Sequence, residues 1–334
     1  MEGVEMKVRD MEFWKNKKVL ITGFEGFLGS NLVKALLKRK AKIIGLDIKT
    51  FRKETILCCQ DYKKIAVYKG SVTNRNLVRD ILRKHSINII FHLAAEAIVS
   101  RSQQNPLKAF EANISGTWEV LEAARLQGNV QAIIVASSDK AYGAHKKLPY
   151  REYAPLIANH PYDVSKSCAD LITYTYFYTY GLPVAITRCG NIYGPGDFNF
   201  SRLIPDTIRC LLYDKTLKIR SDGKFVRDYV YVDDIVNGYI KIAELLKRSN
   251  LSGEAFNFSD EKPLTVMGVL KEIKNLGFSV NNLKYRIMNI AKYEIKEQYL
   301  SSRKARRLLG WKPKYSIKEG LKKTVGWYFA YFRK

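Results

Sequence analysis

The chain is poor in the residues that crosslink proteins, bind structural metals or span membranes. Its 334 residues include five cysteines and no Cys-x-x-Cys pair, which argues against a disulfide framework and fits a reducing compartment. No run of about 18 apolar residues occurs, which excludes a membrane-spanning helix. Residues 1–18 lack an apolar stretch, so we expect no secretory signal and a cytoplasmic protein. The histidines lack metal-ligand spacing, so we expect no metal: they are His85, His92, His145 and His160.

Acidic residues are also scarce relative to basic ones. The 57 Lys and Arg outnumber the 32 Asp and Glu, which gives a net charge of +25. Nearly half of this excess lies in residues 281–334, with fifteen basic and three acidic residues. Such a segment indicates either a solvated lysine-rich surface or a polyanion-binding face. We expect the solvated surface, and no nucleic-acid partner.

Strand and helix patterns alternate from the start of the chain to about residue 195. Apolar runs predict strands at 18–22, 43–46, 65–68, 89–93, 132–136 and 183–187, separated by helical patterns at 28–36, 75–85, 107–127 and 162–180. This alternation predicts an α/β fold, a Rossmann-type doubly wound parallel sheet covered on both faces. We expect residues 1–195 to form this domain, with segment exchange near 225–260. Residues 196–334 then form mainly a smaller substrate-binding domain.

Three glycines follow the first predicted strand and open the first long helix: Gly23, Gly26 and Gly29. Glycines there permit a tight turn and let backbone N–H groups approach a pyrophosphate at the positive end of the helix. At the end of the next strand, Asp47 can accept the ribose hydroxyls of NAD and repel the 2′-phosphate of NADP. An ordinary turn residue is the alternative for Asp47. Three basic residues keep NADP open: Lys49, Arg52 and Lys53.

A tyrosine and a lysine stand four residues apart at the start of the helix predicted at 162–180. Tyr162 and Lys166 therefore share one helix face. The lysine cation favours the phenolate, which suits Tyr162 to act as a general base for a sugar hydroxyl. Tyr142 and Lys146 have the same spacing, but an intervening glycine and a nearby Pro-Tyr turn indicate a loop. We therefore expect the 162–166 pair to be the functional one.

These features belong to a series of motifs: TGFEGFLGS (22–30), FHLAAEA (91–97), NISGTWEVLEAAR (113–125), SSDKAYG (137–143), PYDVSK (161–166), RCGNIYGPGD (188–197), RDYVYVDDI (227–235) and LGWKPK (309–314). Together they resemble the extended short-chain dehydrogenase/reductase family, in its nucleotide-sugar dehydratase and epimerase branch. The resemblance covers about residues 13–315. It implies an NAD-binding domain, a smaller C-terminal domain that binds a nucleotide-diphosphate sugar, and a homodimer that pairs through helices such as 162–180.

The residues after the strand at 132–136 divide this family. Epimerases generally carry small residues after the catalytic serine or threonine, whereas 4,6-dehydratases carry an acid and a second polar residue. Ser138, Asp139 and Lys140 resemble the arrangement of CDP-glucose 4,6-dehydratases, which implies conversion of CDP-glucose to its 4-keto-6-deoxy form. The segment RDYVYVDDI has the form common to epimerases and other dehydratases, so the nucleotide base stays open.

Two other functions also stay open. One is a nucleotide-sugar 4-epimerase of the UDP-glucose or UDP-N-acetylglucosamine type, which needs neither Asp139 nor Lys140. The other, from a different class, is a non-catalytic NAD-sensing or polyanion-binding protein. The intact tyrosine–lysine pair argues against it, because a binder does not need that chemistry.

The resemblance also implies roles for individual residues. Tyr162, helped by Ser138 and Lys166, takes the proton of the C4 hydroxyl. Asp139 protonates the leaving C6 hydroxyl, and Lys140 serves elimination at C5, either as the base or by orienting a water or Asp139. Cofactor contacts fall on Gly23, Gly26, Phe27, Leu28, Gly29, Asp47, Ile48, Leu93, Ala94, Ala95, Tyr162 and Lys166. Contacts to the substrate diphosphate fall on Asn191, Arg202 and Arg227, with a surface salt bridge as the alternative for either arginine.

Overall fold

The computed structural model describes residues 12–277, 283–291 and 294–332, which form two compact units. The first unit comprises the chain up to residue 143, residues 155–188 and residues 236–256. The second comprises residues 144–154, residues 189–235 and the chain from residue 257 onward. Within the described ranges no helix is long and apolar enough to cross a membrane. Most of the segment expected not to be a secretory signal, residues 1–11, lies outside these ranges.

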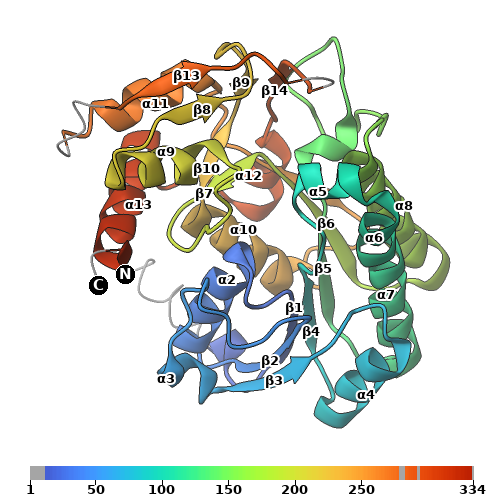
Figure 1. Cartoon of the computed structure of the whole chain (residues 1–334). Helices are drawn as coiled ribbons and strands as arrows, with labels where there is room; N and C mark the ends of the chain where they lie inside the picture. Colours follow the sequence, from blue (N-terminus) through green and yellow to red (C-terminus); the bar gives the residue numbers. More distant parts are fainter. Residues whose placement is uncertain (1–11, 278–282, 292–293, 333–334) are drawn as a thin grey trace, which may run out of the picture. The chain divides into compact units, whose positions relative to one another are not determined.

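A parallel sheet forms the centre of the first unit (Figure 1). Strands β1 to β6 are Lys18–Thr22, Lys42–Asp47, Ile65–Lys69, Ile89–His92, Ala132–Ala136 and Val184–Cys189, and β11 is Ala255–Phe258. The order β11-β6-β5-β4-β1-β2-β3 contains the 3-2-1-4-5-6 arrangement of a doubly wound sheet. All pairs among β1 to β6 are parallel. The predicted fold class is confirmed, and each predicted strand is present within two residues of its expected bounds.

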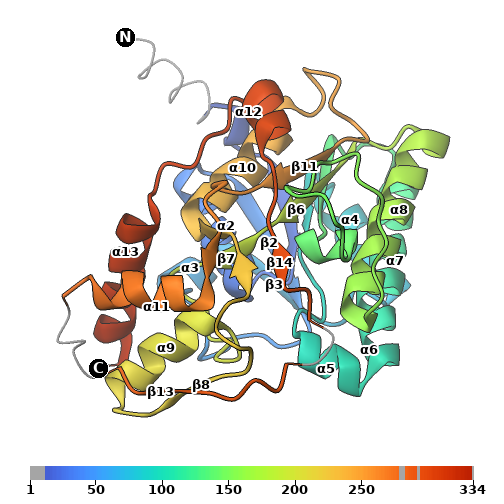
Figure 2. The same cartoon turned by 90° about the horizontal axis from the view of Figure 1, so that it is seen from above.

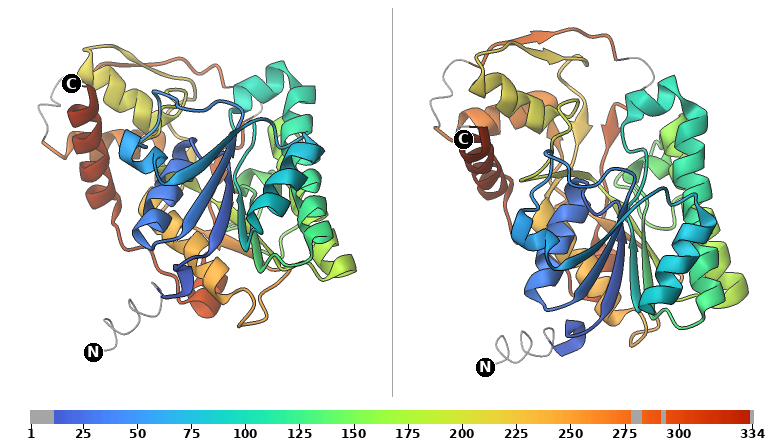
Figure 3. Two further views of the ribbon diagram at one scale, coloured as in Figure 1. Left: turned by 90° about the horizontal axis from the view of Figure 1, so that it is seen from below. Right: turned by 60° about the horizontal axis from the view of Figure 1, so that its bottom comes forward.

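Helices cover both faces of this sheet. They are α2 (Phe27–Lys38), α3 (Cys59–Tyr62), α4 (Arg75–His85), α5 (Val99–Gln104), α6 (Pro106–Phe110), α7 (Gly116–Gln127), α8 (Pro161–Tyr180) and most of α10 (Val232–Leu245). α4, α7 and α8 lie on one face, and α2 and α10 lie on the other (Figures 1 and 3). Because both faces are covered, the strands are apolar along most of their length. Leu20, Ile44 and Val120 belong to the buried cluster that joins the strands to α4 and α7.

The helix predicted over 107–127 is interrupted. Asn105 caps α6 by accepting from the backbone N–H of Lys108, a π-turn follows at Glu111–Ser115, and α7 then runs to its left-handed cap at Gly128. Apolar periodicity does not reveal this break, because a π-turn adds one residue to a turn without changing the composition. Within this π-turn, Asn113 is buried, with 1% of its surface exposed.

The second unit combines short strands with helices. β7 (Asn191–Tyr193) pairs with β10 (Tyr229–Tyr231), β9 (Val226–Arg227) lies between β12 (Leu264–Thr265) and β14 (Glu297–Gln298), and β8 (Leu217–Ile219) pairs with β13 (Tyr285–Ile287). Its helices include α9 (Leu203–Leu212), α11 (Val266–Lys274), α12 (Arg303–Leu309) and α13 (Ile317–Phe332). Their core is rich in tyrosine, with Tyr193, Tyr231 and Tyr328 buried together. In the basic segment, α12 buries Ala305 and Leu309 and exposes Arg303 and Arg307.

Candidate active site

The turn after β1 has a shape that requires glycine at two positions. Gly23 has a φ of +71°, and a Cβ there would stand 2.9 Å from the backbone nitrogen of Ala94. A Cβ on Gly29 would stand 2.2 Å from the carbonyl oxygen of Gly23. α2 begins at Phe27, after Gly26, with no side chain capping its first N–H groups. Such a turn at a helix N-terminus fits the diphosphate of a dinucleotide.

Glu25, in the middle of this turn, has a role that the sequence analysis missed. It is 1% exposed, and its carboxylate accepts hydrogen bonds from the backbone N–H groups of Phe51 (2.6 Å) and Arg52 (2.7 Å). The side chain therefore fastens the loop after β2 to the glycine turn. The available signal was the acid itself, because a carboxylate inside a phosphate-binding turn repels phosphate unless its charge is engaged elsewhere.

Asp47 stands at the end of β2 and is 6% exposed. Its carboxylate accepts from the N–H groups of Glu25 and Lys49, at 3.4 Å each, and pairs with the guanidinium of Arg52. Burial raises the pKa of Asp47, and the charge of Arg52 opposes that rise. Arg52, one of the basic residues that leave NADP open as the alternative cofactor, is thus held by Asp47. Of the neighbouring predicted residues, Ile48 is exposed, whereas Phe27 and Leu28 are half-buried in the first turn of α2.

The end of β4 is tied to the end of β1. The backbone N–H groups of Leu93 and Ala94 donate to Thr22 Oγ1 at 3.2 and 3.1 Å, and Ala95 follows them. The Thr22 hydroxyl lies 2.8 Å from His92 Nδ1, and since it already accepts twice, it donates its own proton to this nitrogen. Burial lowers the pKa of His92 to about 3, so His92 is a neutral core residue that supports the turn.

The end of β5 carries three of the predicted catalytic residues. Ser138 caps a short 3₁₀ helix, η2 (Asp139–Tyr142), with its hydroxyl. Ser138 Oγ accepts from the backbone N–H of Lys140 (3.2 Å) and donates to Asp139 Oδ1 (3.0 Å). Asp139 is 5% exposed, and Lys140 is half-buried. Tyr162 and Lys166 lie in the first turns of α8, which packs against η2, so the structure brings all five residues to one place.

Lys166 is anchored to the same strand end. Its ammonium donates to the carbonyl oxygen of Ala136 at 2.7 Å, and Ser137 Oγ donates to the carbonyl oxygen of Lys166 at 3.4 Å. Burial lowers the pKa of Lys166 to about 8, although the charge of Asp170 opposes this. An amine with a pKa near 8 is still mostly a cation at neutral pH, so Lys166 can favour the phenolate of Tyr162.

A buried ion pair beneath η2 was not anticipated from the sequence. The guanidinium of Arg188, in β6, makes two hydrogen bonds of 2.8 Å to the carboxylate of Asp170, in α8, and a third of 2.8 Å to the hydroxyl of Tyr142. The side chains of the pair are 6% and 4% exposed. Tyr142, expected in a loop, is therefore a buried residue of η2. An arginine inside a buried strand needs a charged partner, but the sequence does not say which one.

Asn113 connects the π-turn with the catalytic helix. Its amide nitrogen donates to Ser165 Oγ at 2.8 Å and to the carbonyl oxygen of Glu96 at 3.2 Å, and its amide oxygen accepts from the N–H of Glu96 at 2.7 Å. Ser165 immediately precedes Lys166. This link, also missed from the sequence, fixes the start of α8 relative to the segment after β4.

In the second unit, the predicted substrate residues already have partners within the chain. Asn191 Nδ2 donates to the carbonyl oxygen of Asp228 at 3.4 Å. Arg202 pairs at 3.0 Å with Asp197, which is 1% exposed, and the guanidinium of Arg227 donates to the carbonyl oxygens of residues 226, 295 and 296. The Asn191 side chain thus lies beside Asp228, the residue that follows Arg227 in the chain.

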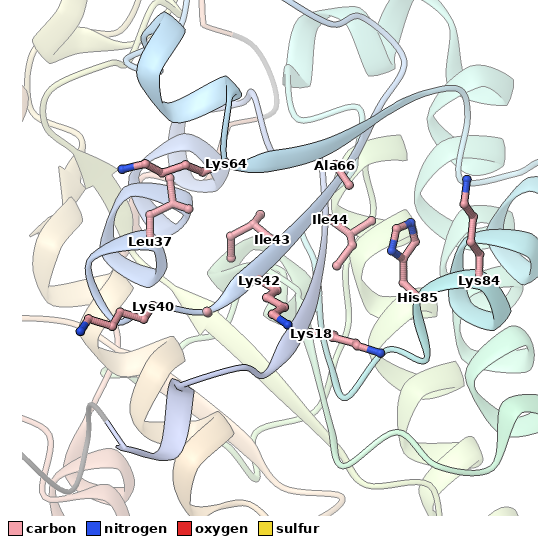
Figure 4. A pocket seen from close by; sticks show the side chains of 11 residues that line it. Lys18, Leu37, Lys40, Lys42, Ile43, Ile44, Lys64, Ala66, Lys84 and His85 are labelled. Carbon is pink, nitrogen blue, oxygen red and sulfur yellow. The ribbon is translucent and has the colours of Figure 1, made fainter.

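A hollow of about 550 Å³ lies away from these residues, at the amino ends of β1, β2 and β3 (Figure 4). Ile43 and Ile44 line it together with five lysines, but the ammonium groups of Lys40 and Lys64 point away from it. The candidate residues follow the opposite, carboxyl ends of the strands, so this hollow is no part of the site. Across the described ranges, no cluster of three or more His, Cys, Asp or Glu residues could hold a metal ion.

Comparison with known proteins agrees with this geometry. The family profile of GDP-mannose 4,6 dehydratase matches residues 20–324. UDP-glucuronate 4-epimerase from Thermodesulfobacterium geofontis is 30% identical, and the alignment covers 92% of this chain and 95% of the epimerase. CDP-glucose 4,6-dehydratase from Salmonella typhimurium is 29% identical, covering 97% and 94%. The structure of dTDP-glucose 4,6-dehydratase from Streptomyces venezuelae with NAD bound is 30% identical, with a TM-score of 0.83 and coverage of 94% and 97%.

The family match spans both the dinucleotide cradle and the second unit. The relatives include dehydratases and epimerases that act on nucleotide sugars. The predicted resemblance is confirmed: the chain belongs to the GDP-mannose 4,6 dehydratase family, within the nucleotide-sugar dehydratases and epimerases of the extended short-chain dehydrogenase/reductase fold.

Proposed function

We propose that the protein is an NAD-dependent nucleotide-sugar 4,6-dehydratase with CDP-glucose as its substrate. The observation that carries this proposal is the Asp139–Lys140 pair, which follows β5 and packs against the start of α8, beside the predicted base Tyr162. Elimination needs an acid and a second polar group in addition to the tyrosine–lysine pair. The similarity to the CDP-glucose enzyme from Salmonella typhimurium supports the choice of sugar nucleotide.

The cradle in the first unit is proposed to hold NAD. The glycine turn and the start of α2 would bind its diphosphate, and Asp47 would accept the hydroxyls of the adenosine ribose. When bound, NAD would accept the hydride from C4, and its reduced form would return the hydride to C6.

The residues of the chain then move the protons. Tyr162, whose phenolate is favoured by Lys166, takes the proton of the C4 hydroxyl. A ketone at C4 acidifies the C5 hydrogen, so a modest base at Lys140 suffices to remove it. Asp139 donates its proton to the C6 hydroxyl, which leaves as water, and Lys140 then returns the proton to C5.

The second unit is proposed to bind the nucleotide diphosphate, with residues 196–334 as the main part of that domain. Asn191, Arg202 and Arg227 are the candidate contacts. A guanidinium carries five N–H donors, so Arg202 can hold Asp197 and a phosphate oxygen at the same time.

A nucleotide-sugar 4-epimerase is the second candidate, favoured by the similarity to UDP-glucuronate 4-epimerase. That reaction uses Tyr162, Lys166 and Ser138 but needs neither Asp139 nor Lys140. The deciding experiment is incubation of the purified protein with CDP-, dTDP-, UDP- and GDP-hexoses, followed by mass spectrometry. A loss of water from CDP-glucose supports the proposal, whereas an unchanged mass with altered stereochemistry identifies an epimerase.

We expect the protein to bind NAD more tightly than NADP because of Asp47. In Asp47→Ala this preference should shrink by about tenfold, since the ribose hydroxyls lose a charge-assisted hydrogen bond and Arg52 is released to meet a 2′-phosphate. Titration calorimetry with both dinucleotides measures the change. An unaltered preference in this variant, or tighter binding of NADP by the parent, contradicts the assignment.

We propose a homodimer formed through the outer face of α7 and α8, which run side by side (Figures 1 and 2). Tyr174 and Tyr178 of α8 are 47% and 78% exposed, and Trp118 and Leu126 of α7 are exposed as well. Phe177, which lies three residues after Tyr174 and one before Tyr178, instead packs against the core of its own unit.

The exposed tyrosines allow this dimer to be tested. The parent should have the mass of a dimer in solution scattering at micromolar concentration. Tyr174→Glu combined with Tyr178→Glu should give a folded monomer, because the charges keep this face hydrated. A monomeric parent excludes the proposed interface.

A further inference from the structure

Asp163 is a buried carboxylate that the proposed mechanism does not use. It is the third residue of α8, directly after Tyr162, and only 5% of its surface is exposed. Its Oδ1 atom is enclosed and has no hydrogen-bond partner among the described residues. Buried carboxylates are nearly always paired, so an exception calls for a reason.

Other buried acids of the first unit follow the rule. Asp170 pairs with Arg188, Glu119 pairs with Arg75 and Asp47 pairs with Arg52. Among these four buried acids, only Asp163 forms no ion pair with a described residue, although it stands in the same helix as Asp170.

The charges that act on Asp163 come from the candidate active site. Burial raises the pKa of Asp163 to about 6, the Lys140 and His160 charges lower it, and the Asp139 charge raises it. Lys140 and Asp139 belong to η2, which packs against α8, and His160 precedes the first turn of α8. The acid is thus enclosed next to the two residues proposed for elimination.

We propose that Asp163 is a positioning residue for Lys140: its carboxylate attracts the Lys140 side chain and holds it beside Asp139 during elimination. This inference rests on the proposed dehydratase function. Asp163 itself neither gains nor loses a proton in the reaction. Its protonation at low pH removes the attraction, so elimination should fail while oxidation at C4 continues.

The first test is Asp163→Asn, which keeps the shape of the side chain and removes its charge. With the sugar nucleotide that the parent dehydrates, the dehydrated product should fall at least about tenfold, as should uptake of deuterium at C5 from heavy water. Oxidation at C4, followed by near-ultraviolet absorbance, should keep its parental rate. In the parent, elimination should decline below about pH 6, and this decline should be absent from the residual activity of the variant.

Asp163→Glu and Asp80→Asn serve as controls. Asp163→Glu restores a carboxylate and should recover part of the product and the decline below about pH 6. Asp80 lies on α4 in an exposed pair with Arg83, and its substitution should change neither rate nor pH dependence. Parental elimination in Asp163→Asn, with the decline retained, overturns the inference.

The second test measures stability without turnover. The pKa of Asp163 is raised above its unfolded value, so its ionised form is disfavoured in the fold, and stability is lost as pH rises through about 6. Asp163→Asn should therefore melt at least about 2 °C higher than the parent at pH 7.5 and show a smaller difference at pH 5. A lower melting temperature at both pH values marks a structural role and contradicts the inference.

The two proposals fail in different ways. If the parent releases no water from any of the four sugar nucleotides, the dehydratase function fails and this inference fails with it. If the parent dehydrates CDP-glucose and Asp163→Asn does so equally fast, the function stands and only the role of Asp163 is wrong.

Discussion

The Lys140→Ala variant is expected to oxidise the substrate at C4 and to stop before elimination. Enzyme-bound NADH should accumulate after substrate is added, and the dehydrated product should fall by a factor of about 10² to 10⁴, the range for loss of a general base. The physical reason is that oxidation at C4 and elimination use different residues. Tyr162 and Lys166 lie on α8 and are untouched, whereas Lys140 lies on η2. Absorbance near 340 nm and product mass separate the two steps.

Asp139→Asn should stop the reaction at the same point, because an amide cannot protonate the leaving hydroxyl. Lys146→Ala is the matched control. Lys146 is exposed and follows Tyr142 by four residues, as Lys166 follows Tyr162, but the Tyr142 hydroxyl is held by Arg188. This variant should turn over like the parent. If Lys140→Ala and Asp139→Asn both turn over at the parental rate and accumulate no NADH, the proposed elimination is wrong and the epimerase is the remaining candidate function.

The sequence predicts the sheet well because the signals for it are local. Each strand is an apolar run, and the glycine turn is read from three residues within seven positions. The pair Tyr162 and Lys166 is equally local, since both stand on one helix face. The interruption at the π-turn is not predicted, because it leaves the apolar pattern unchanged.

The supports of the site escape prediction because their partners are distant in sequence. Glu25 binds the backbone 26 and 27 residues away, Asn113 reaches Ser165 at a separation of 52, and Arg188 reaches Tyr142 at 46. No spacing rule identifies such partners before the fold is known. The roles proposed for Arg202 and Arg227 stay predictions: Arg202 pairs with Asp197, and Arg227 donates to backbone carbonyl oxygens.

The largest expected loss of stability is that of Asp170→Asn. The substitution leaves Arg188 in β6, with 6% of its side chain exposed, without the carboxylate that it contacts through two hydrogen bonds. Arginine stays charged, so the buried cation is no longer compensated, and the free energy of unfolding should fall by about 3–5 kcal/mol. Urea denaturation followed by tryptophan fluorescence and by circular dichroism measures this loss and shows whether the two units unfold together.

A double variant distinguishes the stability that the ion pair contributes from the destabilisation caused by one unpaired buried charge. Asp170→Leu combined with Arg188→Met removes both charges, and its loss should be clearly smaller than the sum of the two single losses, because no unpaired ion is left in the core. Asp80→Ala, which breaks the exposed pair with Arg83 on α4, should change the free energy of unfolding by no more than about 0.5 kcal/mol. Arg188 also holds the Tyr142 hydroxyl, and the Asp170 charge keeps the pKa of Lys166 from falling further, so Asp170→Asn should loosen η2 and slow both elimination and oxidation at C4. A loss below about 1 kcal/mol in Asp170→Asn, with both steps unaffected, would show that the pair supports neither the core nor the site.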